Sequence, residues 1–495
     1  MMQNNQLNEN ERSDYRETLR STSLIGGASL LNILIGMVRT KFVASLLGPA
    51  GVGLLGMFTQ VTSLVTTVSG MGLASSGVRQ VAEAVGSEDD EWVSRTIITL
   101  RRVAWVTGGL GTAAMFSLSE IISQVTFGSR EYSVSIALLS ITILLTAITA
   151  GQTCILRGTR RIGDLAKINV LGALSATFIS IPCFYIWGQE GIAVSLILYA
   201  VAFLSISWWF ARRVPVKIVR MRWSESRMEA RKLLVLGVSF MGAGVVAMLS
   251  NYLIRVFLVR GLNLEAVGIY QAAFSLSGIL VSFILSAMGT DFYPRLTSVE
   301  YDNFKVTDMV NKQTEIMIFL ALPGLTAMML FAPIVIELFY SKSFIEATPL
   351  LRWFLIGTIF RVFSWPLNYT VLAKGKGRIF FIIETLNSVI HVTMVCVLSK
   401  QFGIIGAGVA FLLSYIFYTV LLLFVVDKIV GFTWNIRTIK IVTISIMSIV
   451  LMKINTIFDY MPTVFLSLNC VMFLLISVYC SFNLLNRSGI KLKIF

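Results

Sequence analysis

The sequence predicts an all-α polytopic membrane protein with about fourteen transmembrane helices. It also predicts their arrangement, as two repeat-related lobes of six helices followed by two extra C-terminal helices. Three observations support this fold class. The mean hydropathy is +0.80, with 56% hydrophobic and only 14% charged residues, which is far from the balance of a soluble protein. Apolar runs long enough to cross about 30 Å of hydrocarbon follow one another along the chain. One order of motifs occurs twice.

The repeat consists of matched segments about 215 residues apart. TKFVASLLGPAGVGLLGMF (40–58) matches RVFLVRGLNLEAVGIYQAAF (255–274), and MGLASSGVRQ (71–80) matches MGTDFYPRL (288–296). Further matched segments follow downstream as far as residues 191–200 and 406–415. Two related halves in one polytopic chain imply a cleft between them, which is the geometry of transporters.

Fourteen apolar runs are expected to span the membrane. In order, they cover residues 21–46, 53–83, 97–126, 133–155, 167–187, 190–211, 232–260, 265–293, 313–339, 350–372, 378–399, 404–426, 437–457 and 461–484. The expected divisions are a cytoplasmic tail (1–20), an N-lobe (21–222), a C-lobe (223–430), and a final helix pair with a cytoplasmic C-terminus (431–495).

Basic residues are concentrated at alternate connections and so orient the chain. They gather in the first tail, at 157–167, 212–232 and 374–378, and at the C-terminus, whereas the connections on the other side carry few. By the positive-inside rule, both termini are expected in the cytoplasm. The net charge of +15 is therefore a topology signal and does not indicate nucleic-acid binding.

Several other functions are excluded by what the chain lacks. It has one histidine and five cysteines without paired spacing, so a metal site is not expected. No P-loop and no sizeable soluble insertion occur, which excludes ATP-driven transport within this polypeptide and argues against an enzyme. Transport would have to draw on an ion gradient, a partner, or consumption of the product.

Charges inside the second half suggest a polar cluster, because ionisable groups at membrane depth are costly. Arg361 lies in the tenth span about 13 residues before Lys374, and His391 lies 13 residues after Arg378. Adjacent antiparallel spans would place Arg361 near His391, and Asn368 near Glu384. The alternative is a structural polar clamp between two helices.

A second set of cations lies on the repeat-related spans one and seven. These are Arg39, Lys41, Arg255 and Arg260, and arginine and lysine suit the recognition of phosphate or pyrophosphate. Snorkelling to the outer headgroups is the alternative, and the better one for Lys41 and Arg260.

Three charges near the inner ends of spans two and eight are either gate residues or ordinary interfacial charges. They are Arg79, Asp291 and Arg295.

Several segments resemble a known family. GPAGVGL (48–54) resembles the turn after the first span of the Wzx-type polysaccharide flippases. GLASSGVRQVAEA (72–84) and LRGTRRIGDLAKIN (156–169) are similar to the inner connections of the O-antigen and lipid III translocases. These belong to the multidrug/oligosaccharidyl-lipid/polysaccharide exporter superfamily. The extra spans thirteen and fourteen depart from the commonest twelve-span form, as they do in lipid II flippases.

The resemblance implies a bacterial inner-membrane protein with two six-helix lobes in a V around a cationic cavity. It implies a flippase that moves an undecaprenyl-pyrophosphate-linked oligosaccharide (an O-antigen, enterobacterial common antigen or similar unit) to the periplasmic leaflet by alternating access. The substrate-binding candidates are then Arg39, Lys41, Arg255, Arg260, Arg361 and Asn368. Uncharged groups such as Gln60, Gln152, Asn251, Gln271, Trp365 and Tyr369 are candidates for sugar contact.

Coupling to protons or sodium would use Glu384 with His391, because burial makes a carboxylate easier to protonate. No cofactor beyond such an ion is expected. The expected partners are the lipid-linked glycan, the bilayer and, on the far side, an O-antigen polymerase and chain-length regulator.

Two other functions stay open. The alternative within the superfamily is an ion-coupled exporter of small drugs, whose cavity should carry acidic residues. A membrane enzyme acting on a lipid carrier would need a long outer loop, and the chain has none.

Overall fold

A computed structural model describes residues 2–217, 219, 221–455 and 462–488. The chain is 89% helical, and no strand occurs in these ranges, which confirms the predicted all-α class. The chain forms two compact units, Met1–Tyr252 and Leu253–Phe495, which meet within one helix, α9. Lys491 and Lys493, two of the basic residues at the C-terminus, lie outside the described residues.

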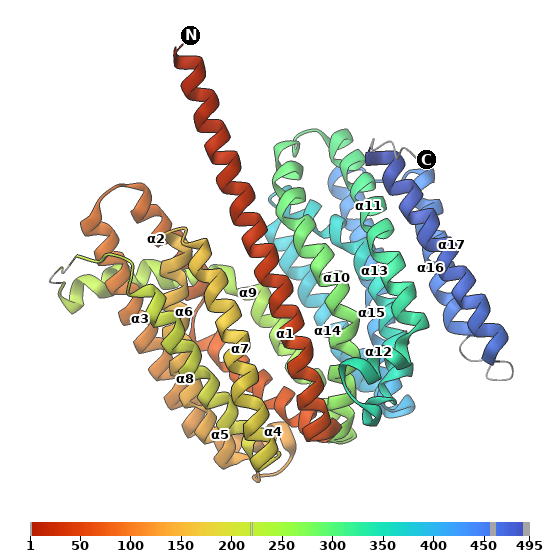
Figure 1. The fold of residues 1–495 in the computed structure, drawn as a ribbon, viewed down its shortest axis with the longest axis horizontal. Helices are drawn as coiled ribbons and strands as arrows, with labels where there is room; N and C mark the ends of the chain where they lie inside the picture. Colours follow the sequence, from red (N-terminus) through yellow and green to blue (C-terminus); the bar gives the residue numbers. More distant parts are fainter. Residues whose placement is uncertain (1, 218, 220, 456–461, 489–495) are drawn as a thin grey trace. The chain divides into compact units, whose positions relative to one another are not determined.

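The first unit contains eight helices and most of a ninth (Figure 1). They are α1 (Met2–Ser69), α2 (Leu73–Gly86), α3 (Asp90–Ser117), α4 (Ser119–Phe127), α5 (Ser133–Leu139), α6 (Ile141–Gly158), α7 (Ile162–Trp187), α8 (Gly191–Ala211) and the beginning of α9 (Trp223–Gly261).

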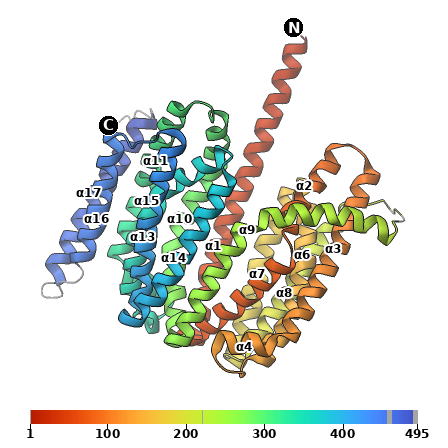
Figure 2. The same cartoon turned by 180° about the vertical axis from the view of Figure 1, so that it is seen from behind.

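The second unit contains the end of α9 and the helices that follow it (Figure 2). They are α10 (Leu264–Ser298), α11 (Asn303–Leu330), α12 (Ala332–Phe339), the 3-10 turn η1 (Lys342–Phe344), α13 (Ala347–Ala373), α14 (Gly377–Phe402), α15 (Ile404–Val430), α16 (Ile436–Asn455) and α17 (Pro462–Ser488).

Helix α1 changes direction at Gly48, where the predicted first span ends. Gly48 has φ 64° and ψ −175°, which are not helical values, and Pro49 follows it. Glycine adopts positive φ without steric cost, and proline offers no N–H to continue the helical hydrogen bonds. The predicted break between spans one and two is therefore confirmed.

The predicted second span, 53–83, is wrong as one continuous helix. The chain leaves the helix after Ser69 and re-enters it at Leu73, with positive φ at Met71 (45°) and Gly72 (70°). The physical reason is a close approach of two backbones. A Cβ on Gly72 would lie 2.1 Å from the carbonyl oxygen of Gly237 on α9, which is too close for any side chain.

The predicted spans 97–126 and 313–339 are also wrong as single helices. Each ends early, at Ser117 and at Leu330, and a short helix follows, α4 or α12. The two long helices otherwise match, since both contain 28 residues and both begin at an aspartate cap.

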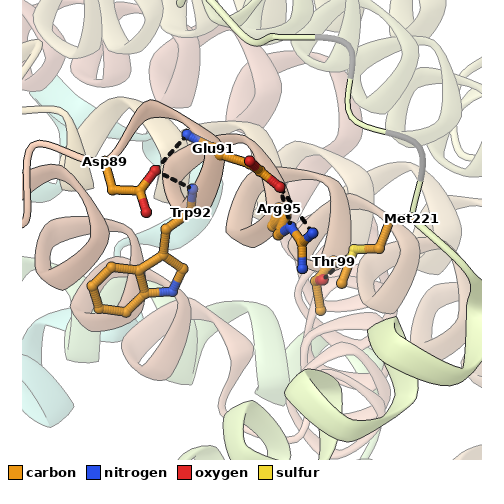
Figure 3. Close-up of polar contacts among 6 residues, drawn as sticks. All are labelled: Asp89, Glu91, Trp92, Arg95, Thr99 and Met221. Atoms are coloured by element: carbon orange, nitrogen blue, oxygen red, sulfur yellow. Dashed lines mark hydrogen bonds and ion pairs between the residues drawn. The ribbon is translucent and has the colours of Figure 1, made fainter.

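Aspartate caps satisfy the free N–H groups at the start of α3 and α11. Asp89 accepts hydrogen bonds from the backbone N–H groups of Glu91 (2.9 Å) and Trp92 (3.2 Å), as Figure 3 shows. Asp302 accepts equivalent bonds from Phe304 and Lys305, both at 3.1 Å. Side-chain capping of this kind fixes where a helix begins.

Each unit has its own apolar core of large side chains that are 3% exposed or less. The first core contains Leu73, Val81, Ile97, Leu100, Phe210 and Leu233, and the second contains Phe292, Val310, Leu367, Leu422 and Phe432. These residues come from helices far apart in sequence, so each unit is held by long-range packing.

Eleven segments of the described chain are long and apolar enough to cross a membrane. The first of them, Gly26–Ser69, contains the turn at Gly48. Helices α3 and α10 lie outside this set, although they are 28 and 35 residues long. The chain is thus a multi-pass membrane protein, and the count of fourteen stays a prediction.

Candidate functional site

Glu384 on α14 is held by side chains from the two neighbouring helices. The hydroxyl of Tyr418 on α15 donates to Glu384 Oε1, and Nδ2 of Asn368 on α13 donates to the same oxygen at 3.2 Å. The expectation that Asn368 lies near Glu384 is confirmed. Asn368 Oδ1 is buried and accepts no hydrogen bond in the structure, so this amide keeps an unused acceptor.

Arg361 belongs to the same cluster. It lies half-buried on α13, seven residues before Asn368, so both project from one helical face. The charges of Arg361 and Glu384 both act on the phenols of Tyr415 and Tyr418. We call Arg361, Asn368, Glu384, Tyr415 and Tyr418 the α13–α15 cluster. It brings a cation and a carboxylate together among apolar helices.

His391 lies seven residues after Glu384 on the same face of α14. Its ring meets Phe411 edge-on at a centroid distance of 5.8 Å, and its Nε2 is buried without a hydrogen-bond partner. Among the described side chains, no hydrogen bond joins His391 to Arg361. The expectation that Arg361 lies near His391 therefore stays a prediction, and the ring contact of His391 in the structure is with Phe411.

Arg255 is the most deeply buried of the predicted cations. Its side chain lies on α9, and the residue is 7% exposed. Arg255 Nη2 donates to Gln271 Oε1 on α10 at 2.6 Å, and Gln271 Nε2 in turn donates to Ser275 Oγ at 2.8 Å. Gln271, a predicted sugar contact, thus orients the guanidinium. An arginine that donates to a neutral amide can also donate to an anion, because its guanidinium carries five N–H groups.

Arg39 is the corresponding cation of the first unit. It is half-buried on α1, and its Nε donates to Ser180 Oγ on α7 at 3.2 Å. Lys41 is half-buried two residues later, and Arg260 at the end of α9 is exposed. The exposure of Arg260 agrees with the snorkelling alternative. Arg39 and Arg255 both have neutral hydrogen-bond partners, although they belong to different units.

The three predicted gate residues lie on exposed helix surfaces. Arg79 pairs with Glu83 at 2.9 Å on α2, and Asp291 pairs with Arg295 at 2.9 Å on α10. Both pairs join residues four apart in one helix, and more than half of the surface of Arg79, Asp291 and Arg295 is exposed. Ion pairs of this kind are weak, so little energy would be needed to exchange their partners. Their gating role stays a prediction.

Sequence reasoning missed a buried polar group on α11. Glu315 is 3% exposed and accepts a hydrogen bond from Thr438 Oγ1 on α16 at 2.7 Å. One turn earlier, Asn311 donates to the carbonyl oxygen of Thr433 (3.1 Å) and accepts from the N–H of Asn435 (3.0 Å). These bonds attach α16 to α11. The available signal was a charge inside an apolar run, the same signal that identified Arg361.

No group of three or more histidine, cysteine, aspartate or glutamate side chains suited to a metal occurs in the described ranges. The chemistry within reach of these residues is recognition of an anion by arginine and exchange of an ion at a carboxylate. Neither breaks a covalent bond.

Comparison with known proteins identifies the family. Residues 42–349, which are more than half of the chain, match a family model described as "Polysaccharide biosynthesis protein". The lipid III flippase of Escherichia coli (strain K12) is 23% identical over 412 residues, covering 81% of this chain and 96% of that protein. Curated relatives are named as flippases and transporters and not as enzymes.

Solved structures show the same fold. An inward-facing multidrug resistance transporter of the MATE family aligns with a TM-score of 0.71 at 15% identity, covering 81% of this chain and 94% of its own. A lipid II flippase in an inward closed conformation aligns with a TM-score of 0.65 at 15% identity, covering 94% and 99%. The predicted all-α polytopic fold is confirmed, and the family match agrees with the resemblance to the polysaccharide flippases. On this evidence, the chain is a multi-pass membrane protein that belongs to the polysaccharide biosynthesis protein family.

Proposed function

We propose that this protein is a flippase for an undecaprenyl-pyrophosphate-linked oligosaccharide. It would carry the repeat unit of an O-antigen, enterobacterial common antigen or similar glycan from the cytoplasmic to the periplasmic leaflet of a bacterial inner membrane by alternating access. Both termini would lie in the cytoplasm. The observation that carries the proposal is Arg255, a buried cation fixed by the neutral amide of Gln271.

The chemistry of the cargo fits such a cation. A pyrophosphate diester carries two negative charges, and arginine offers a planar set of N–H donors that matches phosphate oxygens. Arg39 donates to the neutral side chain of Ser180 and Arg255 to that of Gln271, so each of these cations has a neutral partner. The family membership and the flippases among the relatives support the same class of substrate.

Energy would enter through the α13–α15 cluster. Glu384 is held by two neutral donors, with Arg361 close to the same phenols. Loading of a proton or sodium ion on Glu384 would change how strongly it competes for Arg361, and so link the ion to the anion site. On the far side, a polymerase and a chain-length regulator would use the delivered unit.

The test is deletion followed by complementation. A strain that lacks the protein should lose surface polysaccharide and accumulate lipid-linked repeat units, and the wild-type gene should reverse both changes. Arg255→Gln should lower complementation by about ten- to a hundred-fold, because a hydrogen bond to a charged group is worth about 1.4–2.8 kcal/mol. Arg255→Lys should retain part of the activity.

Arg260→Gln is the matched control. It removes the same charge from the exposed end of the same helix, and it should complement almost fully at an equal amount of membrane protein. Normal polysaccharide in the deletion strain, together with a changed sensitivity to drugs, would instead support the drug exporter.

The coupling step has its own test in proteoliposomes with an imposed proton or sodium gradient. Glu384→Gln should abolish the dependence of transport on the gradient, and His391→Ala should weaken it. Glu346→Gln, on an exposed residue at the start of α13, should leave it intact. Ion-dependent transport that survives in both Glu384→Gln and His391→Ala would exclude these residues from coupling.

A further inference from the structure

The first thirteen residues of α9, 223–235, form a helix with two distinct faces. We call this segment the surface helix. Figure 2 shows that α9 first runs across the ends of α6 and α8 and then changes direction. At about 100° per residue, Trp223, Arg227 and Arg231 lie on one face, and Ser226, Glu229 and Leu233 lie on the opposite one.

The second face is fastened to α3. Thr99 donates to Glu229 Oε2 at 3.0 Å, Arg102 Nη1 donates to Ser226 Oγ, and Arg102 Nη2 donates to the carbonyl oxygen of Met221 at 3.1 Å. Leu233 is 1% exposed and lies in the core of the first unit. These contacts fix which face of the surface helix points away from the protein.

The segment before the surface helix is fastened to the same end of α3. Lys217 Nζ pairs with Asp90 at 2.8 Å, and its backbone N–H donates to Ser94 Oγ at 2.9 Å. The hydrogen bond to the Asp90 carboxylate raises the pKa of Lys217, so the lysine stays charged. The surface helix is thus held at both its start and its inner side.

The outer face combines basic and apolar groups. Trp223, Met228 and Val235 are 65%, 66% and 63% exposed, and Arg227 and Arg231 between them are exposed as well. Both acidic side chains of the segment, Glu225 and Glu229, lie off this face. An exposed face with arginines beside tryptophan and aliphatic groups is typical of a helix that lies in a membrane interface.

The end of α8 marks the level of that interface. Trp208 and Trp209 are exposed there, and the guanidinium groups of Arg212 and Arg213 lie over their rings at 5.3 Å and 4.2 Å. Tryptophans followed at once by arginines are the usual boundary between hydrocarbon and headgroups. Only eleven residues, 212–222, separate this boundary from the surface helix.

We propose that the outer face of the surface helix binds the headgroups of anionic phospholipids in the leaflet at this end of the spans. Arg227 and Arg231 contact the phosphates, while Trp223, Met228 and Val235 enter the boundary between headgroups and acyl chains. Charge complementarity selects anionic over zwitterionic lipid.

The same helix connects lipid binding to the transport pathway. Two residues after Val235, the backbone of Gly237 touches the break between α1 and α2 at Met71 and Gly72. Further along, α9 carries Arg255. Anionic lipid bound to the surface helix therefore contacts the same helix that holds the proposed anion site, and this part of the inference rests on the proposed function.

The test measures lipid binding by the purified full-length protein without cargo. Native mass spectrometry and thermal unfolding would follow titration with phosphatidylglycerol, with phosphatidylcholine as the zwitterionic comparison. Each arginine near an anionic surface strengthens binding about fivefold, so Arg227→Gln with Arg231→Gln should weaken the response about 25-fold. The matched control is Arg130→Gln with Lys342→Gln, which removes two exposed positive charges that are each already paired with a glutamate and should leave the response nearly unchanged.

A second measurement locates Trp223. In vesicles containing phosphatidylglycerol, lipids brominated near the headgroup should quench its emission, seen as the difference between wild type and Trp223→Phe. A wild-type response to phosphatidylglycerol in the double arginine variant would overturn the proposal, as would an unquenched Trp223. If those variants lose polysaccharide export but keep the lipid response, the face binds a soluble partner. The lipid-titration and quenching measurements do not use the cargo, so their failure leaves the flippase proposal standing.

Discussion

The dipeptide Met-Gly occurs at the same place in both repeats, and it has a different structure in each. At Met71-Gly72 the chain breaks between α1 and α2 with positive φ at both residues. At Met288-Gly289 helix α10 runs on without interruption from Leu264 to Ser298. The same local sequence is compatible with both conformations, so a tertiary contact decides between them.

That contact differs between the units. Gly72 lies against the backbone of Gly237, where a Cβ would be 2.1 Å from a carbonyl oxygen. Gly289 faces side chains, Trp365 at 3.0 Å and the Tyr369 hydroxyl at 3.1 Å from a Cβ built there. A side chain can move by a few tenths of an ångström, whereas a helix backbone cannot. The first unit therefore contains a fixed break, and the second contains an adjustable packing contact.

The largest predicted effect comes from placing alanine at the two matched glycines. Gly72→Ala should destabilise the protein by about 4 kcal/mol, because it meets both a backbone clash and a left-handed φ. Gly289→Ala should change stability by about 1 kcal/mol or less, since alanine favours the helix while the aromatic rings shift slightly. Thermal unfolding of the two purified variants measures the difference.

Gly237→Ala is the companion variant, because its Cβ would lie 2.2 Å from the carbonyl oxygen of Met71. It should resemble Gly72→Ala. Equal stability of Gly72→Ala and Gly289→Ala would show that the break does not depend on the Gly237 contact.

A second comparison concerns the long helices α3 and α11, which are matched by their aspartate caps. Counted from those caps, Arg102 and Glu315 occupy the same position. Each binds the segment that follows the last of its unit's six repeat-related spans. Arg102 bonds to Ser226 and Met221 after α8, and Glu315 bonds to Thr438 after α15. The position is shared, and the charge is opposite.

Removing these contacts should release the segment that follows. Glu315→Leu should cost about 2–3 kcal/mol, because Thr438 loses its acceptor inside a buried contact, and Arg102→Met about 1–2 kcal/mol, because Arg102 is partly exposed. Limited proteolysis should show faster cleavage near residues 431–436 in the first variant and near 214–222 in the second. Cleavage at both places in either variant would mean that the loss of one contact also loosens the segment bound by the other.

Removal of the aspartate caps of α3 and α11 should also destabilise the protein, but by less. Asp89→Ala should cost about 1 kcal/mol, and Asp302→Ala should also destabilise.

The backbone N–H and the ammonium of Lys305 lower the pKa of Asp302 below its ordinary value of 3.8. A lowered pKa stabilises the fold above pH 3.8, and this contribution is lost as the pH falls below that value. The gap in melting temperature between wild type and Asp302→Asn should therefore narrow between pH 5 and pH 3. A gap that widens on acidification would contradict this account.

The smallest effects are expected at the exposed pairs of α2 and α10. Arg79→Gln and Arg295→Gln should each change stability by less than about 0.5 kcal/mol. Export assays on these stable variants then isolate any role in gating. Normal export in both would show that they are ordinary interfacial charges.

The helical class, the repeat and the family could all be predicted from the sequence, because length, hydropathy and matched motifs are local properties. The hydrogen bond between Asn368 and Glu384 also followed, since equal depth on adjacent helices is enough to place two side chains together. The breaks at Met71 and after Ser117 did not follow. They depend on which residues pack against the chain. An apolar run has the same sequence pattern whether or not a turn interrupts its helix.

The partners of the charged groups were equally hard to predict. Gln271 bonds to Arg255 and Tyr418 bonds to Glu384, but both are neutral. A search of the sequence for opposite charges therefore does not find them. Glu315 was missed for a different reason. Its contact lies on α16, outside the repeat, and no match between the halves points to it.

The hydrogen bonds from α3 and α11 to the segments that follow each set of six repeat-related spans also have an evolutionary consequence. A gene duplication that copied this position would give α11 a polar side chain at the same place as Arg102 on α3. At first, no following segment would be present to bond to it. New helices added at the end of the chain could dock there at once, and the change from arginine to glutamate would favour the amino-terminal end of a helix, where partial positive charge gathers. α16 begins with such an end, capped by Asn435, three residues before the Thr438 that bonds to Glu315.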